Sequence, residues 1–209
     1  MVGRQQRAYN VQHYASHRDA EIQRVKDRQR AAAELLNSLR RVPCADCRRC
    51  FPPHMMDFDH RNPNTKSFTL GGKCQLKSEE AILREVAKCD VVCANCHRLR
   101  TQRQRASFLW SWPKGGVSPR LPARTKIRLR QVELLKRLRS VPCFDCRCSF
   151  PAFVMEFDHR DARTKRGLVT HMAGRASDSR IFEEAAKCDV VCSNCHRHRT
   201  FVRRHSTRE

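Results

Sequence analysis

Cysteine pairs separated by two residues recur along the chain, and two of these pairs are followed directly by histidine. The phrase CDVVCANCHRLRT begins at Cys89, and CDVVCSNCHRHRT begins at Cys188. A CxxC turn places two thiolates on one edge of a tetrahedron, so two such turns close a four-sulfur metal site. In both copies an earlier CxxC precedes the second one across a gap of 45 residues. The predicted zinc ligands are Cys44, Cys47, Cys93 and Cys96 in the first site, and Cys143, Cys146, Cys192 and Cys195 in the second.

The expected role of these two zinc ions is structural, because four protein ligands leave no position for water or substrate. Iron is the main alternative, since four thiolates also suit it. The chain has 13 cysteines and no apolar secretory segment at its start, which argues against a disulfide framework. Cys89 and Cys188 lie in short apolar segments, where we expect buried, non-ligating side chains.

A second group of reactive residues lies between the cysteine pairs. The stretch MDFDHR begins at Met56 and is matched by MEFDHR at Met155. Its alternating pattern predicts a short strand that ends in Asp-His. Zinc would bring this strand end close to the histidine that follows the last cysteine, which predicts two candidate sites. Their members are Asp59, His60 and His97 in the first copy, and Asp158, His159 and His196 in the second.

An aspartate and two histidines beside a basic surface suit metal-assisted hydrolysis of a phosphodiester. The carboxylate and one imidazole would hold a divalent cation, Mg²⁺ or Mn²⁺, at up to two sites, and the cation would stabilise charge on the phosphate. The other histidine would take a proton from the attacking water. The alternative is that the aspartate only caps a turn and that the histidine lies on the surface.

The two groups belong to a tandem repeat, because shifting the sequence by 99 residues superposes the cysteines, Asp-His and the final histidine without a gap. The predicted fold class is α+β, with two small zinc-stabilised modules, each preceded by a helix, at 25–41 and at 124–140. The expected organisation is a basic arm at 1–24, a first helix and module at 25–106, a Pro/Gly linker at 107–123, a second helix and module at 124–204, and a tail at 205–209.

The charge of the chain indicates a polyanionic partner. It holds 43 Lys and Arg against 21 Asp and Glu, a formal net charge of +22. Nucleic acid is the first candidate and an anionic membrane the second. The sequence contains no run apolar enough to cross a membrane and begins without a secretory signal. We therefore expect an intracellular location, in the cytoplasm, nucleus or nucleoid, and an organellar transit peptide stays open as an alternative.

The order CxxC, Asp-His, CxxC-His resembles the HNH endonuclease family, the ββα-metal nucleases, in its four-cysteine zinc-knuckle branch. The resemblance covers about residues 42–104 and again 141–203 and implies two treble-clef-like ββα-metal modules. It implies that His60 and His159 are general bases. It also implies that Asp59 with His97, and Asp158 with His196, hold the catalytic cation.

One feature departs from that family, which often has an asparagine about five residues before the third cysteine. Lys88 and Lys187 occupy those positions here. Asn95 and Asn194, inside the second knuckle, are the candidates for the orienting role, with helix capping as the alternative. Asp57 and Glu156 precede the Asp-His aspartate by two residues, and we expect them to be exposed strand residues rather than supports for the site.

Arginines that follow the last histidine are expected to contact the phosphate backbone without reading sequence. They are Arg98, Arg100, Arg103, Arg197, Arg199 and Arg203. The predicted function is a metal-dependent endonuclease acting on double-stranded DNA. A monomeric pseudo-dimer with one site per strand is one arrangement, and a nickase with one active site is the other. The alternative function is a non-catalytic tandem zinc module that binds DNA or RNA.

Overall fold

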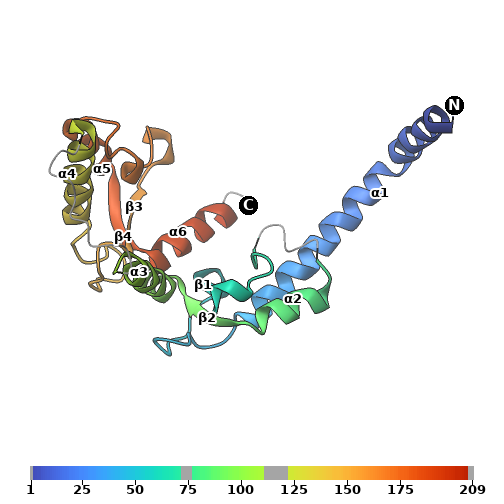
Figure 1. Cartoon of the computed structure of the whole chain (residues 1–209), viewed down its shortest axis with the longest axis horizontal. Helices are drawn as coiled ribbons and strands as arrows, with labels where there is room; N and C mark the ends of the chain where they lie inside the picture. The colour runs from blue at the N-terminus through green and yellow to red at the C-terminus, as the bar shows by residue number, and fades with distance from the viewer. Residues whose placement is uncertain (1, 72–76, 111–121, 207–209) are drawn as a thin grey trace. The chain divides into compact units, whose positions relative to one another are not determined.

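The structure, a computed structural model, describes residues 2–71, 77–110 and 122–206. The chain forms two compact units, Met1–Val92 and Cys93–Glu209. The structure combines helices with two small two-stranded sheets, β1 with β2 and β3 with β4, which confirms the predicted α+β class (Figure 1). None of the helices in the described ranges is both long enough and apolar enough to span a bilayer.

The second unit is built on the hairpin-like pair β3 (Met155–His159) and β4 (Cys188–Cys192). The two strands are antiparallel, and their register pairs Met155 with Cys192 and His159 with Cys188. Helix α6 (Ser193–Ser206) follows β4 directly (Figure 1). This strand–strand–helix order places the end of β3 and the first turn of α6 in one unit, as the sequence predicts.

Further helices complete the second unit. Helix α3 (Ala94–Trp110) opens it, and α4 (Ala123–Leu138) and α5 (Asp178–Ala185) contribute to one of its apolar clusters. Helix α5 begins after Ser177, whose hydroxyl accepts the amide of Arg180 and so caps the first turn. Helix α4 contributes Leu135 and α5 contributes Ile181, and both side chains are buried in that cluster with Val169.

The glutamine of α4 fixes the loop that leads into α5. Gln131 is only 1% exposed. Its amide nitrogen donates to the carbonyl of Ala176 at 2.9 Å and to Asp178 Oδ1 at 2.7 Å, and its Oε1 accepts the amide of Gly174 at 2.6 Å. Gly174 has φ +75 and a Cβ there would lie 3.0 Å from Arg128 Cβ, so a side chain at this turn would be strained. The loop therefore depends on a single buried amide.

Gln131→Ala is expected to lower the free energy of unfolding by about 2 kcal/mol, because it removes three hydrogen bonds and leaves the loop amide unsatisfied. Chemical denaturation measures this loss. Glu133→Ala, an exposed change on the same helix, is the matched control and is expected to cost less than about 0.5 kcal/mol. Equal losses for the two variants would contradict the role assigned to Gln131.

The first unit repeats the strand–strand arrangement with its own helices. It contains α1 (Val2–Leu39), β1 (Met56–His60) and α2 (Glu79–Val86), and it ends within β2 (Cys89–Cys93). Short 3-10 turns at Pro53–Met55 and Pro63–Thr65 flank β1. Its apolar cluster buries Ala32 and Leu36 of α1 against Leu70, Ile82 and Cys89.

The helices differ from the predicted ranges in three places. The helix expected at 25–41 is Val2–Leu39, so residues 2–24 of the predicted basic arm are part of the same helix. Residues 107–110, assigned to the linker, continue α3 to Trp110, while 111–121 lie outside the described residues. The helix expected at 124–140 is confirmed as Ala123–Leu138. In the tail expected at 205–209, residues 205 and 206 continue α6, and 207–209 lie outside the described residues.

Candidate functional site

The structure gathers the predicted zinc ligands into two groups of four cysteines. Within each group the Sγ atoms all lie within 4.8 Å of one another. A tetrahedral zinc ion with Zn–S bonds of about 2.3 Å requires sulfur–sulfur distances of about 3.8 Å, which this grouping accommodates. The groups are Cys44, Cys47, Cys93 and Cys96, and Cys143, Cys146, Cys192 and Cys195. Each group could therefore hold a metal ion such as zinc.

Four further cysteines in the described ranges, Cys50, Cys89, Cys148 and Cys188, are not members of these groups, and Cys74 lies outside the described residues. Cys89 and Cys188 are each 8% exposed, which confirms that they are buried, and each Sγ lies 3.4 Å from a glutamate carbonyl oxygen one helical turn earlier. Burial raises the pKa of both thiols to about 11, so they are protonated at neutral pH. Cys50 and Cys148 are exposed.

The first knuckle of each module is a tight turn. In the second module the amide of Arg147 donates to the carbonyl of Cys143 at 2.9 Å. The backbone amide of Cys143 donates to the carbonyl of Cys148, also at 2.9 Å. Arg147 has φ 60, as does Arg48 in the first module. The left-handed region costs an ordinary residue about 1 kcal/mol, and only glycine adopts it readily. The turn that presents the first two thiolates is thus locally strained.

Arg147→Gly is expected to keep or raise the stability of the second module, whereas Arg147→Val is expected to lower it by about 1–2 kcal/mol, because a branched side chain tolerates positive φ least. Denaturation with zinc held constant measures both. The Arg48 pair of substitutions provides an independent repeat in the first module. Similar stabilities for the glycine and valine variants would show that the turn carries no such strain.

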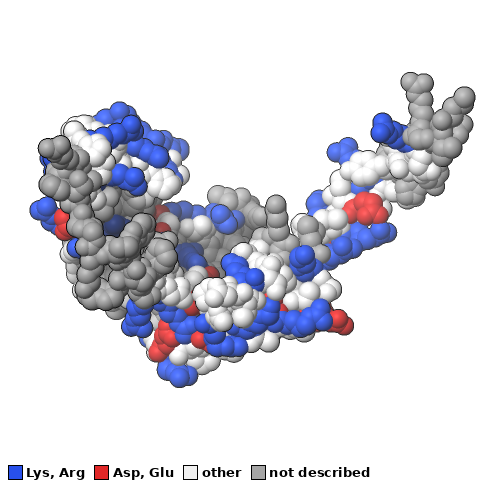
Figure 2. All heavy atoms as spheres, in the orientation of Figure 1, with Lys and Arg blue, Asp and Glu red and all other residues white. Residues whose placement is uncertain are grey.

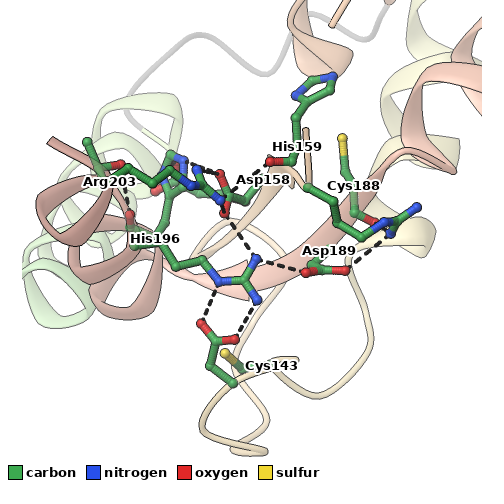
Figure 3. A network of polar contacts seen from close by, with 12 residues as sticks. Cys143, Asp158, His159, Cys188, Asp189, His196 and Arg203 are labelled. Carbon is green, nitrogen blue, oxygen red and sulfur yellow. Dashed lines mark hydrogen bonds and ion pairs between the residues drawn. The ribbon is translucent and has the colours of Figure 1, made fainter. Parts of the chain in front are cut away.

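Asp158 and His159 end β3 and are both buried, at 4% and 8% exposure. Neighbouring residues of a strand point to opposite faces. The imidazole of His159 accordingly points away from the Asp158 carboxylate (Figure 3). The predicted base and the predicted metal ligand therefore have different sets of partners.

His159 is held by a glutamate of α5. Its Nε2 lies 2.8 Å from Oε1 of Glu184, which is 2% exposed. Burial raises the pKa of Glu184, but hydrogen bonds from Lys187, from the amides of Arg166 and Gly167 and from His159 outweigh it and lower the pKa to about 2. Glu184 is therefore a carboxylate at neutral pH and can only accept.

The tautomer of His159 follows from that carboxylate. A hydrogen bond to one ring nitrogen determines which nitrogen of a neutral imidazole carries the proton. In a neutral His159 imidazole, Nε2 therefore donates to Glu184 and the lone pair is on Nδ1. This is the form that a general base requires.

The first module contains the same pair. His60 Nε2 lies 2.8 Å from Oε1 of Glu85, and Glu85 Oε2 accepts Lys88 Nζ at 2.6 Å. The pKa of Glu85, which burial would raise, is likewise lowered to about 2 by Lys88, His60 and two backbone amides. Lys88 and Lys187 occupy the positions where the HNH family often has asparagine. Each lysine binds the glutamate of its module, and that glutamate binds the histidine.

Asp158 meets His196 of α6, as the sequence predicts. His196 Nε2 lies 3.5 Å from Asp158 Oδ1, and its Nδ1 lies 2.9 Å from Glu156 Oε2. The two carboxylates raise the pKa of His196 to about 9, with Asp158 the larger cause. Glu156 is half-buried and bonded to His196, so the expectation that it is an exposed strand residue is wrong.

Two arginines of α6 also bind Asp158. Arg203 contacts both carboxylate oxygens, at 2.8 and 2.7 Å, and Arg199 Nη1 lies 3.0 Å from Oδ2 (Figure 3). Burial raises the pKa of Asp158, but His196, Arg203 and Arg199 outweigh it and hold that pKa well below its ordinary value. Arg199 also binds Asp145 at 2.8 Å and Asp189 at 2.8 Å. Both arginines, which were predicted to contact phosphate, therefore bind carboxylates of the chain itself.

A cavity of about 320 Å³ lies beside the Asp-His end of β3 and the first turn of α6. It is lined by Asp158, His159 and His196, together with Glu156 and several basic residues. The basic residues at its wall are Arg98, Arg139, Lys165 and Arg203. Residues of the predicted base and of the predicted ligand pair therefore line one cavity, although the imidazole of His159 points away from the Asp158 carboxylate, and the rings of His159 and His196 belong to different hydrogen-bond networks.

Asn95 and Asn194 are buried in the first turns of α3 and α6, at 6% and 5% exposure. The amide of Asn95 donates to Asn194 Oδ1 at 3.1 Å, and the amide of Asn194 donates to Asn95 Oδ1 at 3.0 Å. Each side chain accepts from a first-turn amide, as a capping residue does, but the amide belongs to the other helix. Neither of these two hydrogen bonds involves His159 or His60.

The remaining predicted residues are placed as follows. Asp59 lies in β1 and His97 in the first turn of α3, and both are half-buried. Arg98 is exposed and binds Glu156. Arg100 is half-buried and Arg103 exposed on α3, and Arg197 is half-buried on α6. Glu85 and Glu184 are site residues that were not predicted, although the 99-residue repeat retains both as acids between the Asp-His strand and the second knuckle.

Comparison of the chain with protein-family models, with curated proteins and with solved structures finds no match. The resemblance to HNH nucleases therefore rests on the motif residues alone.

Proposed function

We propose that the chain is a metal-dependent endonuclease that hydrolyses phosphodiester bonds of nucleic acid, with double-stranded DNA as the first substrate to test. The observation that carries this proposal is the cavity of about 320 Å³ that Asp158, His159 and His196 line together. A tautomer-fixed imidazole, a carboxylate and a second imidazole at one basic cavity are the groups that metal-assisted hydrolysis requires.

His159 acts as the general base in this proposal. Its Nε2–H is bound to Glu184, so Nδ1 accepts the proton of the attacking water. The buried carboxylate orients the ring and stabilises the imidazolium that forms. His60 and Glu85 have the same arrangement in the first module, which supports the same role there.

Asp158 and His196 would hold the cation, as Asp59 and His97 would in the first module. When bound, a divalent cation supplies positive charge to the phosphate and to its leaving oxygen. The donor set fits a hard cation, because a carboxylate and an imidazole suit Mg²⁺ or Mn²⁺. An imidazolium has no lone pair for a metal, so binding requires His196 to give up the proton that Asp158 and Glu156 stabilise.

The two four-cysteine groups are assigned to structural zinc. Each is closed by four protein sulfurs, and the sulfurs of each second pair end a strand and begin a helix that carries the candidate site. Zinc would thus fix the position of His196 relative to the first knuckle.

Substrate binding is assigned to the basic surface. Lys and Arg atoms are spread over the visible face of both units and outnumber the Asp and Glu atoms there (Figure 2). Contacts of this kind bind the phosphate backbone without reading sequence, and their affinity falls steeply as salt is added.

The test is cleavage of supercoiled plasmid by the purified chain with Mg²⁺ or Mn²⁺, with EDTA as the metal control. We expect nicked and linear product that disappears in the His60→Ala/His159→Ala double variant. Comparison of the two single variants then separates one active site from two. Tight binding with no cleavage across metals would refute the nuclease.

A non-catalytic tandem zinc module that binds DNA or RNA is the second candidate. The observation that favours it is the pair of arginines on Asp158, because Arg199 and Arg203 neutralise the carboxylate that a cation would need. In that case plasmid binding would need no added Mg²⁺ or Mn²⁺ and would be unchanged by His159→Ala, and no product would form.

A further inference from the structure

Helices α3 and α6 occupy equivalent positions in the two repeats and touch at their first turns. Asn95 and Asn194, which are 99 residues apart, exchange reciprocal hydrogen bonds of 3.1 and 3.0 Å. A reciprocal contact between equivalent residues is the arrangement of a two-fold dimer interface. The contact places the first-repeat helix α3 beside the start of α6, where His196 lies.

Arg98 of α3 uses this position to reach the second site. Its Nη2 lies 2.6 Å from Glu156 Oε1, and its Nη1 lies 3.3 Å from the carbonyl of Phe153. Arg98 also lines the cavity that Asp158, His159 and His196 share. A residue of the first repeat thus forms part of the wall of the second repeat's cavity.

Glu156 connects Arg98 to the candidate metal ligands. Its Oε1 also accepts Ser193 Oγ at 2.9 Å, while its Oε2 lies 2.9 Å from His196 Nδ1. The other nitrogen of His196 faces Asp158 at 3.5 Å. Arg98 and Ser193 therefore hold one oxygen of Glu156, and this leaves the other oxygen aimed at the imidazole. Groups that orient a ligating histidine in this way typically change activity 10- to 100-fold when removed.

The geometry points to Arg98 as a positioning residue of the second site, supplied by the first repeat, so that the second site is complete only when both repeats are joined. This inference rests on the proposed nuclease function. In the sequence, Arg98 directly follows His97 of the first site, but its contacts with Glu156 and Phe153 are in the second.

The test uses the full chain with one site inactivated. His60→Ala leaves only the second site, and adding Arg98→Ala is expected to lower kcat for plasmid nicking about 10- to 100-fold, with KM changed less than about twofold. Arg98→Lys is expected to recover part of the loss, because an ammonium retains one contact with Glu156. Gln102→Ala, an exposed neutral change on the same helix, is the control and should leave the rate unchanged.

The same substitution in a chain whose second site is inactivated shows which of the two sites depends on Arg98. With His159→Ala only the first site is left, and there Arg98→Ala is expected to have the smaller effect. NMR signals of the His196 ring provide a readout without cleavage, and they should shift in Arg98→Ala but not in Gln102→Ala. A normal rate in His60→Ala/Arg98→Ala, or a loss confined to the first site, would overturn the inference and leave the nuclease standing. Absence of cleavage by the unsubstituted chain would overturn the proposed function and the role of Arg98 with it.

Discussion

Cys143→Ser is expected to release the metal of the second module and to unfold that module, while the first module keeps its own metal. Cys143 is fully buried, and its Sγ accepts the amide of Cys192 at 3.2 Å, so the sulfur belongs both to the metal group and to the apolar cluster. The other buried members of that cluster are Val154, Met155, Val191 and Cys192, and partly buried Leu99, Phe150 and Phe153 pack against it. Metal binding in small zinc domains contributes on the order of 10 kcal/mol to folding, more than so small a core supplies.

Metal analysis and circular dichroism measure the two parts of this result. The parent should hold one zinc ion in each of the two groups, and Cys143→Ser should hold zinc in the first group only. Cys148→Ser is the matched control, since Cys148 is exposed and outside both groups, and it should keep both ions. Iron in the purified protein would correct the identity of the metal and leave the structural role in place. Retention of both ions by Cys143→Ser would refute the assigned ligand set.

The repeat is why so much of the fold could be predicted from sequence. The alternating segments MDFDH and MEFDH lie at the same offset as the two copies of the apolar segment CDVVC, and all four are strands in the structure. Zinc spacing is a local signal, because two residues between cysteines fix the geometry of one tetrahedral edge. The pairing of Asp158 with His196 follows from that frame, because β4 and α6 are continuous through the second knuckle.

The partners of the charged residues could not be predicted in the same way. Arg199 and Arg203 were assigned to phosphate because a sequence gives their charge but not their neighbours, and the structure pairs both with Asp158. Glu184 is 25 residues from His159, and only the packing of α5 beside β4 brings the two together. The contact between Asn95 and Asn194 likewise depends on tertiary packing alone.

Glu184→Gln is expected to abolish most of the cleavage by the second site while the module stays folded. A glutamine has nearly the same volume, but it carries no charge, and its one acceptor oxygen cannot serve both Lys187 and the backbone amides as the two carboxylate oxygens do. Its nitrogen can also donate to His159. The imidazole then loses both its fixed tautomer and the charge that stabilises its protonated form. Loss of proton-transfer catalysis typically costs 10²- to 10⁴-fold in rate.

The measurement is kcat for plasmid nicking in the His60→Ala background, where only the second site is active. We expect a fall of about 10²- to 10⁴-fold with little change in KM, because Glu184 is buried and contacts no substrate. Glu183→Gln is the matched control, an exposed change of the same chemistry on the next residue of α5, and it should retain the parent rate. The equivalent Glu85→Gln in the His159→Ala background should reproduce the loss in the first site. A Glu184→Gln variant that is folded and fully active would exclude His159 as a glutamate-oriented base.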